Sequence, residues 1–439
     1  HNNIFQALFS PNGSQIINFQ NKIARLWDIS AASTLPSPPT TTTKTRETLP
    51  VIPQNQAQIA IFSDHKDIRK AVFSPDGRHI LTTSIDRIPR LWDTKGNLLT
   101  QLQIPKEQLN KPEISPDGRH ILAIGGQSVY LLDIKGNLIQ KFVGDNNYSI
   151  ISAVFSPDGS KVLTASTDDT ARLWDIKGNL LRVFSGHQKF LRSAVFSPNG
   201  NQILTTSFDK TIRLWDINGN LLTVFQDNSD QIQFSPDGSH ILTYMYYARR
   251  NARLWNTKGN LVTDFQEKQD ADIPQTRIYS AVFSPNGRQI LIARENGSVR
   301  LWDTQGKLLA DLRGHDYRVN SAVFSSNGSQ ILTAGADKTA RLWDNKGNLL
   351  AIFRGHEQEV NSAVFSPNGN QILTASSDKT ARLWDISTGI KVSAAEVAFI
   401  TGNQLASQGT VESRKLALLQ LEEAAKLYHV DKNYRQAAS

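Results

Sequence analysis

One unit of about 41 residues recurs along most of the chain. All eight tryptophans stand in the same context: each follows a leucine, and all but one precede an aspartate. They are Trp27, Trp92, Trp174, Trp215, Trp255, Trp302, Trp343 and Trp384. A ninth copy has Leu132 in the tryptophan position. This repeat constrains the fold strongly, because each copy must be a small unit that stacks on its neighbours.

A second marker has the same period. The sequence Ser-Pro-Asp/Asn-Gly begins at Ser10, Ser74, Ser115, Ser156, Ser197, Ser235, Ser284 and Ser366, and a variant Ser-Ser-Asn-Gly begins at Ser325. Proline in the second position and glycine in the fourth are typical of a tight β-turn. The last unit therefore divides into short apolar runs at 362–365, 371–374 and 380–385, and the unit before it adds a fourth run at 349–353. The sequence predicts four short strands in each unit.

These markers, together with the Gly355-His356 pair that opens a unit, resemble the WD-repeat family, specifically its bacterial many-repeat regulatory proteins. The resemblance covers residues 1–388. It implies an all-β fold, a β-propeller of four-stranded antiparallel blades around a central axis. Eight blades are favoured, with the run at 57–63 closing the last blade as its outer strand. Seven or nine blades remain open alternatives.

Composition divides the chain further. Residues 30–56 are rich in proline and threonine, so we expect a flexible linker there. Residues 1–29 would then be a single unit, either the tail of a truncated propeller or an extra blade, and 57–388 would form the propeller. Residues 389–439 lose the repeat, and a capping box at 393–396 indicates a small α-helical extension. Its pattern resembles part of a tetratricopeptide repeat, although a single packed helix fits as well.

The resemblance also implies a buried hydrogen-bond network of His, Ser, Asp and Trp within the blades. The matching residues are His65, Ser84, Asp86 and Trp92; His187, Ser207, Asp209 and Trp215; and His356, Ser376, Asp378 and Trp384. Two sets are incomplete: His315, Asp337 and Trp343 have Gly335 in the serine position, while Ser166, Asp168 and Trp174 have Asp145 near the histidine position. We expect the hydroxyl of serine to accept from tryptophan and to donate to histidine.

Ser, His and Asp are also the residue types of a hydrolytic triad. A single active site would not recur at blade spacing, and one copy lacks its serine, so we interpret the set as structural. The chain has no Cys, which excludes thiol nucleophiles, thiolate metal sites and disulfides. Phosphate-loop, dinucleotide and zinc-protease motifs are missing as well. We therefore expect no enzyme activity, catalytic residue, cofactor or metal.

The chain carries a formal net charge of +8. Eight arginines precede the tryptophans by two residues: Arg25, Arg90, Arg172, Arg213, Arg253, Arg300, Arg341 and Arg382. The repeat distributes this charge around the ring, so we interpret these residues as solvated strand arginines with cross-strand partners. A basic stripe that binds nucleic acid remains the alternative.

The loops that differ between units are the candidate partner-binding rim. Its aromatic and arginine residues are Arg69, Tyr148, Phe190, Arg192, Phe208, Tyr317 and Arg318, together with Tyr244, Tyr246, Tyr247, Arg249 and Arg250 of one enlarged loop. That loop could hold a partner, or its aromatics could merely fill a gap in a degenerate blade.

We therefore predict a non-catalytic protein-interaction scaffold or sensing module, cytoplasmic and part of a larger bacterial signalling protein. We expect its partners to be proteins or peptides, with no membrane and no small-molecule substrate. Nucleic-acid binding and an enzyme that uses a propeller face are the alternatives.

Overall fold

The structure is a computed structural model that describes residues 6–9, 15–20, 23–28, 58–63, 66–104, 107–144, 147–246, 251–266, 276–387 and 418–420. It divides into two compact units, Gln56–Lys391 and a second that combines His1–Asn55 with Val392–Ser439. The second unit contains a three-stranded antiparallel sheet of β1 (Gln6–Phe9), β2 (Gln15–Gln20) and β3 (Ile23–Asp28). In it, residues 418–420 have helical backbone. The other expectations for 389–439, and the linker at 30–56, fall outside the described residues.

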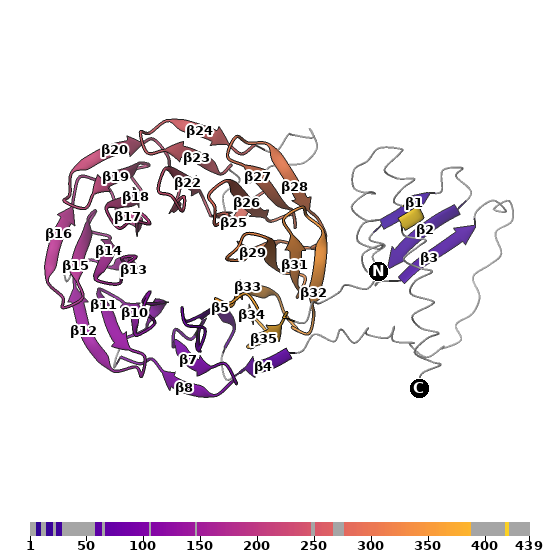
Figure 1. Ribbon diagram of the computed structural model, residues 1–439, viewed down its shortest axis with the longest axis horizontal. Coiled ribbons are helices and arrows are strands. Elements are labelled where there is room, and N and C mark those ends of the chain that lie inside the picture. Colours follow the sequence, from indigo (N-terminus) through magenta and orange to yellow (C-terminus); the bar gives the residue numbers. More distant parts are fainter. Residues whose placement is uncertain are drawn as a thin grey trace. The chain divides into compact units, whose positions relative to one another are not determined.

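The larger unit is a ring of eight four-stranded antiparallel sheets, which confirms the expected eight-bladed propeller (Figure 1). Blade 1 contains β5 (Ile68–Phe73), β6 (His79–Ser84), β7 (Arg90–Asp93) and β8 (Leu98–Gln101). Blade 2 contains β9 (Asn110–Ile114), β10 (His120–Gly125), β11 (Ser128–Asp133) and β12 (Leu138–Val143). Blade 3 contains β13 (Ile150–Phe155), β14 (Lys161–Ser166), β15 (Ala171–Asp175) and β16 (Leu180–Phe184).

The next three blades follow in chain order. Blade 4 contains β17 (Leu191–Phe196), β18 (Gln202–Ser207), β19 (Ile212–Asp216) and β20 (Leu221–Phe225). Blade 5 contains β21 (Gln231–Phe234), β22 (His240–Tyr244), β23 (Arg253–Asn256) and β24 (Leu261–Asp264). Blade 6 contains β25 (Ile278–Phe283), β26 (Gln289–Arg294), β27 (Val299–Asp303) and β28 (Leu308–Leu312).

The last two blades complete the ring. Blade 7 contains β29 (Val319–Phe324), β30 (Gln330–Gly335), β31 (Ala340–Asp344) and β32 (Leu349–Phe353). Blade 8 contains β33 (Val360–Phe365), β34 (Gln371–Ser376), β35 (Ala381–Asp385) and, from the other end of the propeller sequence, β4 (Gln58–Phe62).

Strand β4 closes the ring, because it pairs antiparallel with β35 while the chain continues from it into blade 1. Arg382 lies opposite Ile61, and Ala381 lies opposite Phe62. Strand β34 of blade 8 also contacts β5 of blade 1. Two segments separated by more than 300 residues thus form one sheet, and the edge of β35 is paired within the chain.

The core lies between neighbouring blades. In blades 1, 3, 4, 5, 6 and 8 the tryptophan packs on a phenylalanine at or next to the end of the outer strand of the preceding blade, as Trp215 does on Phe184 and Trp384 on Phe353. Blade 2 has Leu132 in the tryptophan position, and the residue facing it in the same cluster is Leu102 rather than phenylalanine. In blade 7, Trp343 keeps the tryptophan position but shares its cluster with Leu312, so the aromatic pair is the usual inter-blade contact and leucine can replace one or both of its members.

The Ser-Pro-Asp/Asn-Gly turns join the inner and second strands on one face of the ring. In blade 3, the hydroxyl of Ser156 donates to Asp158 and accepts the N–H of Lys161 at 2.9 Å. The turn glycine has a positive φ, +70° for Gly159, which only glycine adopts without strain. A Cβ on this glycine would lie 3.6 Å from Pro116 of the preceding blade, so successive turns stack around the ring.

Candidate functional site

The opposite face of the ring is formed by two loops of each blade: the loop entering the inner strand, and the loop between the second and third strands. We call these loops the rim. In six blades a backbone hydrogen bond of 2.9 to 3.2 Å joins the two loops and brings one residue of each together, which we call a rim pair. The rim pairs are Asp67–Ile85, Ser149–Thr167, Phe190–Phe208, Arg277–Glu295, Arg318–Ala336 and Glu359–Ser377. The same backbone hydrogen bond thus presents different side chains in each of these six blades.

A buried polar tetrad supports the rim in blade 4. His187 Nδ1 lies 2.8 Å from Asp209 Oδ2, and its Nε2 lies 2.8 Å from Thr205 Oγ1. Trp215 donates its indole N–H to the same Thr205 oxygen at 2.9 Å. Because Asp209 also accepts the backbone N–H of Gln188, the tetrad ties the entering loop to the second loop.

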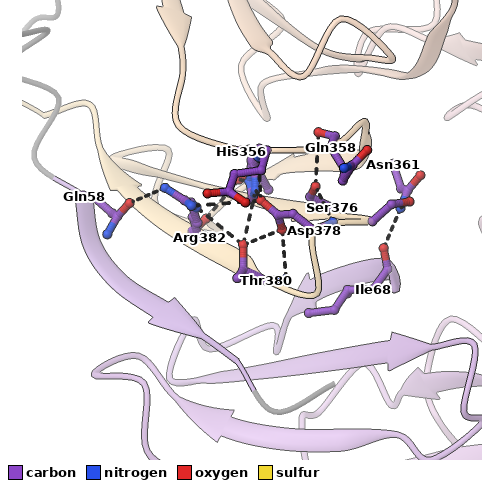
Figure 2. A network of polar contacts seen from close by, with 12 residues as sticks. Gln58, Ile68, His356, Gln358, Asn361, Ser376, Asp378, Thr380 and Arg382 are labelled. Atoms are coloured by element: carbon purple, nitrogen blue, oxygen red, sulfur yellow. Dashed lines mark hydrogen bonds and ion pairs between the residues drawn. The ribbon is translucent and has the colours of Figure 1, made fainter. Parts of the chain in front are cut away.

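Blades 7 and 8 repeat this geometry. In blade 7 the tetrad consists of His315, Asp337, Thr333 and Trp343, with contacts of 2.7 to 3.0 Å. In blade 8 it consists of His356, Asp378, Thr374 and Trp384, also at 2.7 to 3.0 Å. Figure 2 shows the blade 8 network, where Thr380 also donates to Asp378 and Arg382 reaches Gln58 on β4.

The expected role of serine is wrong: threonine, two residues earlier, accepts from tryptophan and contacts histidine. Ser207 instead donates to the carbonyl of Lys189 at 2.6 Å and accepts the N–H of Asp209 at 3.0 Å. Ser376 does the same with Gln358 and Asp378. The reason is position along the strand, because serine sits at its end, level with the turn, while the threonine lies further in, beside the indole.

Threonine also binds the tryptophan in blades 1 and 3. Trp92 donates to Thr82 and Trp174 donates to Thr164, so Ser84 and Ser166 do not hold the indole. Blade 7 lacks the serine altogether. Gly335 occupies its position, and a Cβ there would lie 2.4 Å from His315 Nδ1. The tetrad of blade 7 is complete without a serine, so the serine is not needed to form it.

Burial sets the protonation of the tetrads. It lowers the pKa of His187, His315 and His356, against the raising effect of their aspartate partners. Burial alone would raise the pKa of Asp209, but hydrogen bonds from Thr211 and His187 outweigh it and bring that pKa to about 2. Each described tetrad therefore holds a neutral imidazole against a carboxylate at neutral pH.

In blades 1 and 3 the aspartate pairs with the arginine of the third strand. Asp86 forms an ion pair with Arg90 at 2.9 Å, and Asp168 forms one with Arg172. His65 and Asp145 lie outside the described residues. In blade 5, Asp227 replaces histidine and accepts from Thr243 at 2.8 Å, while Trp255 donates to that threonine. The sequence analysis did not predict this role of Asp227. The signal was its position, because Asp227 follows Phe225 in the segment where blades 4 and 8 have Gly-His after the phenylalanine.

The arginines before the tryptophans are less exposed than expected. Arg90 and Arg341 are only 7% and 5% exposed, so the interpretation of solvated residues is wrong for them. Arg341 pairs with Asp337 at 3.0 Å, four residues earlier in the turn. The aspartate in the turn before the third strand thus explains why a charged side chain can be buried there.

Nine of the twelve candidate rim residues fall into three groups. Tyr148, Phe190, Phe208 and Tyr317 are 40 to 59% exposed. Arg192 and Arg318 are anchored, Arg192 by Asn228 and Arg318 by Glu359. Tyr247, Arg249 and Arg250 lie outside the described residues.

Tyr244 is not a rim residue, which corrects the expectation. It packs against the core cluster between blades 5 and 6, where burial raises its pKa to about 12. Tyr246 is half-buried, with its ring edge-on to Tyr279 at a centroid distance of 5.7 Å. These two tyrosines therefore fill the blade 5–blade 6 junction.

Two hollows open on the rim. One of about 590 Å³ lies where blades 8 and 1 meet and is lined by Asp67, Arg69, Glu357, Gln358, Glu359, Ser377, Asp378 and Lys379. The other, about 360 Å³, is lined by Glu295, Tyr317, Arg318 and Ala336. Among the residues that the structure describes, no three His, Asp or Glu side chains gather as a metal site. In the same part of the chain, no helix has the length and hydropathy to cross a bilayer.

The family model described as WD domain, G-beta repeat matches residues 56–93, 136–175, 178–216, 271–303, 306–344 and 347–385, which is more than half of the chain. The chain belongs to the WD-repeat family. The matched ranges cover six of the repeats, and strand β4 lies in the first of them, ahead of blade 1. A WD-repeat propeller fits a protein-interaction scaffold.

This WD-repeat chain is also similar to nuclear distribution protein PAC1 of two fungi. It is 30% identical over 136 residues to the protein of Coccidioides posadasii, a match that covers 26% of this chain and 29% of the relative. It is 27% identical over 152 residues to the protein of Arthroderma otae, covering 28% and 33%. The matches span about a third of the length of these relatives.

Proposed function

We propose that this propeller is a non-catalytic scaffold whose rim binds other proteins or peptides. The rim pairs carry the proposal. Six blades hold two loops together by the same backbone bond and place different side chains there, from Asp67 and Ile85 in blade 1 to Phe190 and Phe208 in blade 4. Loops on a rigid scaffold that vary while the scaffold repeats are suited to recognition.

The polar chemistry of the blades supports a structural rather than a catalytic role. His187 is 5% exposed, and both of its ring nitrogens are engaged by Asp209 and Thr205. A general base needs a nitrogen that reaches a substrate proton. The arginines favour protein over nucleic-acid partners, because Arg90, Arg172 and Arg341 form ion pairs within their blades and present no free basic stripe.

A cytoplasmic location and membership of a larger bacterial signalling protein are parts of the same proposal. The match to the WD domain supports its scaffold component alone.

Chemical crosslinking of the full chain to partners in cells, read by mass spectrometry, tests the proposal. Arg69→Ala with Tyr317→Ala removes two side chains beside the rim hollows. Lys135→Ala with Lys177→Ala changes two exposed side chains on turns of the opposite face. We expect the first variant to lose captured partners and the second to retain them. Equal capture by both variants would contradict a rim-binding scaffold.

A further inference from the structure

Blade 4 presents an aromatic pair at the rim position where the other described blades have none. Phe190 and Phe208 form its rim pair, joined by the Phe208 N–H and the Phe190 carbonyl at 2.9 Å. Their side chains are 52% and 53% exposed. The equivalent pair in neighbouring blade 3 is Ser149 and Thr167, so the fold does not require phenylalanine there. Two large apolar side chains exposed side by side indicate a binding site.

The pair stands on a rigid base. Ser207 binds the Lys189 carbonyl at 2.6 Å, just before Phe190, and Asp209 is fixed by His187 just after Phe208. Thr206 also donates to the Ser229 carbonyl of blade 5. Because both loops are already ordered, binding here costs little conformational entropy.

Basic side chains flank the aromatic pair. The Arg192 guanidinium lies 4.1 Å from the centre of the Phe208 ring and donates to Asn228 of blade 5 at 3.0 and 3.2 Å. Lys189 directly precedes Phe190, Lys210 follows Phe208 by two residues, and both lysines are exposed. The carboxylate closest in the chain, Asp209, is buried in the tetrad.

Resting on the proposed scaffold function, we propose that the Phe190–Phe208 pair is the anchor site for an acidic peptide segment of a partner protein. An apolar side chain of that segment packs on the two rings, and its carboxylates face Lys189, Lys210 and Arg192. Aromatic anchors supply most of the affinity at such sites, whereas the surrounding charges select partners of the opposite charge.

The repeat supplies matched variants for the test. Phe190→Ser with Phe208→Thr installs the rim pair of blade 3 at the same backbone bond. Lys210→Asp installs the residue of blade 3 at the same left-handed turn position, where φ is +67° for Lys210 and +68° for Asp169. Ser149→Phe with Thr167→Phe moves the aromatic pair to blade 3, beside Asp169 instead of a lysine. Thermal melting of each variant verifies that the ring is intact.

The probe is a random-peptide phage library selected on the full chain, followed by fluorescence anisotropy with the selected peptides. We expect enriched peptides to carry an apolar residue next to Asp or Glu. Their affinity should fall about tenfold or more in F190S/F208T and several-fold in K210D, and should weaken as salt rises. The blade 3 transplant, in the F190S/F208T background, should not restore binding, because its neighbouring charge is acidic.

Enriched peptides that bind wild type and F190S/F208T equally would overturn this site while leaving the rim scaffold in place. Enrichment of basic peptides would overturn the charge assignment, and no enrichment would overturn the peptide-anchor site as a whole. In that last case the crosslinking experiment, which does not touch Phe190 or Phe208, still decides the proposed function independently.

Discussion

Trp215 of blade 4 packs edge-on against Phe184, the last residue of the outer strand of blade 3, with ring centroids 6.0 Å apart. The same relationship joins Phe62 to Trp92, Phe142 to Trp174 and Phe225 to Trp255. Each contact spans two blades, and Phe184 is 1% exposed. The stability of the ring therefore depends on pairs of residues contributed by successive units.

Replacing Phe184 with alanine should destabilise the propeller, because it leaves a cavity under Trp215. Buried Phe→Ala changes typically cost about 3–5 kcal/mol. Leu181→Ala on the same strand is the control, since Leu181 is 41% exposed, and its effect should stay within about 0.5 kcal/mol. Chemical denaturation followed by tryptophan fluorescence measures both, and similar losses for the two would contradict the packing described.

Thr205→Val should cost more than Ser207→Ala. The valine removes the oxygen that Trp215 and His187 share, and leaves two buried polar groups unsatisfied at about 1–3 kcal/mol each. Ser207→Ala removes bonds to Lys189 and Asp209 only, and should cost about 1 kcal/mol. The melting temperatures of the two variants measure these losses. A larger loss for Ser207→Ala than for Thr205→Val would contradict threonine as the partner of tryptophan.

Acidification should destabilise the propeller in two stages. The pKa of His187, His315 and His356 is lower in the fold than the ordinary value of 6.5, so the unfolded chain binds more protons as the pH falls below that value. A further loss should begin below about pH 4, since the pKa of Asp209 is also lowered. Melting temperatures from pH 8 to 3 measure this.

His187→Gln serves as the control for the pH prediction. The variant removes one of the three described tetrad imidazoles, so it should show a weaker dependence of melting temperature on pH between 6.5 and 5. Its low-pH stage should persist, because the aspartates of blades 7 and 8 remain. An unchanged slope in the first stage would mean that the imidazoles are not its source.

Ser326→Pro should stabilise the ring. In seven blades a Cβ on the turn glycine would lie 3.4 to 3.8 Å from a proline of the preceding blade; these glycines are Gly77, Gly118, Gly159, Gly200, Gly238, Gly287 and Gly328. A Cβ on Gly369 would meet no atom within 4 Å, because the preceding blade has Ser326 in the proline position. Proline at a compatible turn position adds about 0.4–1 kcal/mol. Pro285→Ser, one blade earlier, should have the opposite effect on the melting temperature, and a destabilised S326P would contradict the equivalence of the turns.

Much of the fold was predictable because its strands and turns are specified by residues that are close together in the sequence. The period of 41 residues, the turn prolines and glycines, and the alternating apolar runs of a unit such as 362–385 specify strand and turn without reference to the rest of the chain. The Pro/Thr-rich stretch at 30–56 favoured eight blades over seven or nine, and the pairing of β4 with β35 confirms eight.

The candidate site was predictable in part. The histidine–aspartate contact of blade 4 was predicted from the family pattern, and Phe190 and Phe208, which are exposed, were predicted from the variation of the rim loops. The partner of tryptophan did not, because Thr205 and Ser207 differ only in their depth along one strand. Tyr244 was predicted as a rim residue from the sequence, yet it packs against the core cluster at the junction with blade 6 and is partly buried there.

By itself, the sequence determined that one four-stranded unit recurs and that its turns and strands alternate, since backbone conformation responds to neighbouring residues. Only the tertiary structure decided which hydroxyl meets each indole, which arginines are buried, and that Phe190 and Phe208 come together on one rim. These contacts join side chains from different strands and loops. They depend on strand register and blade packing, which a local sequence pattern does not specify.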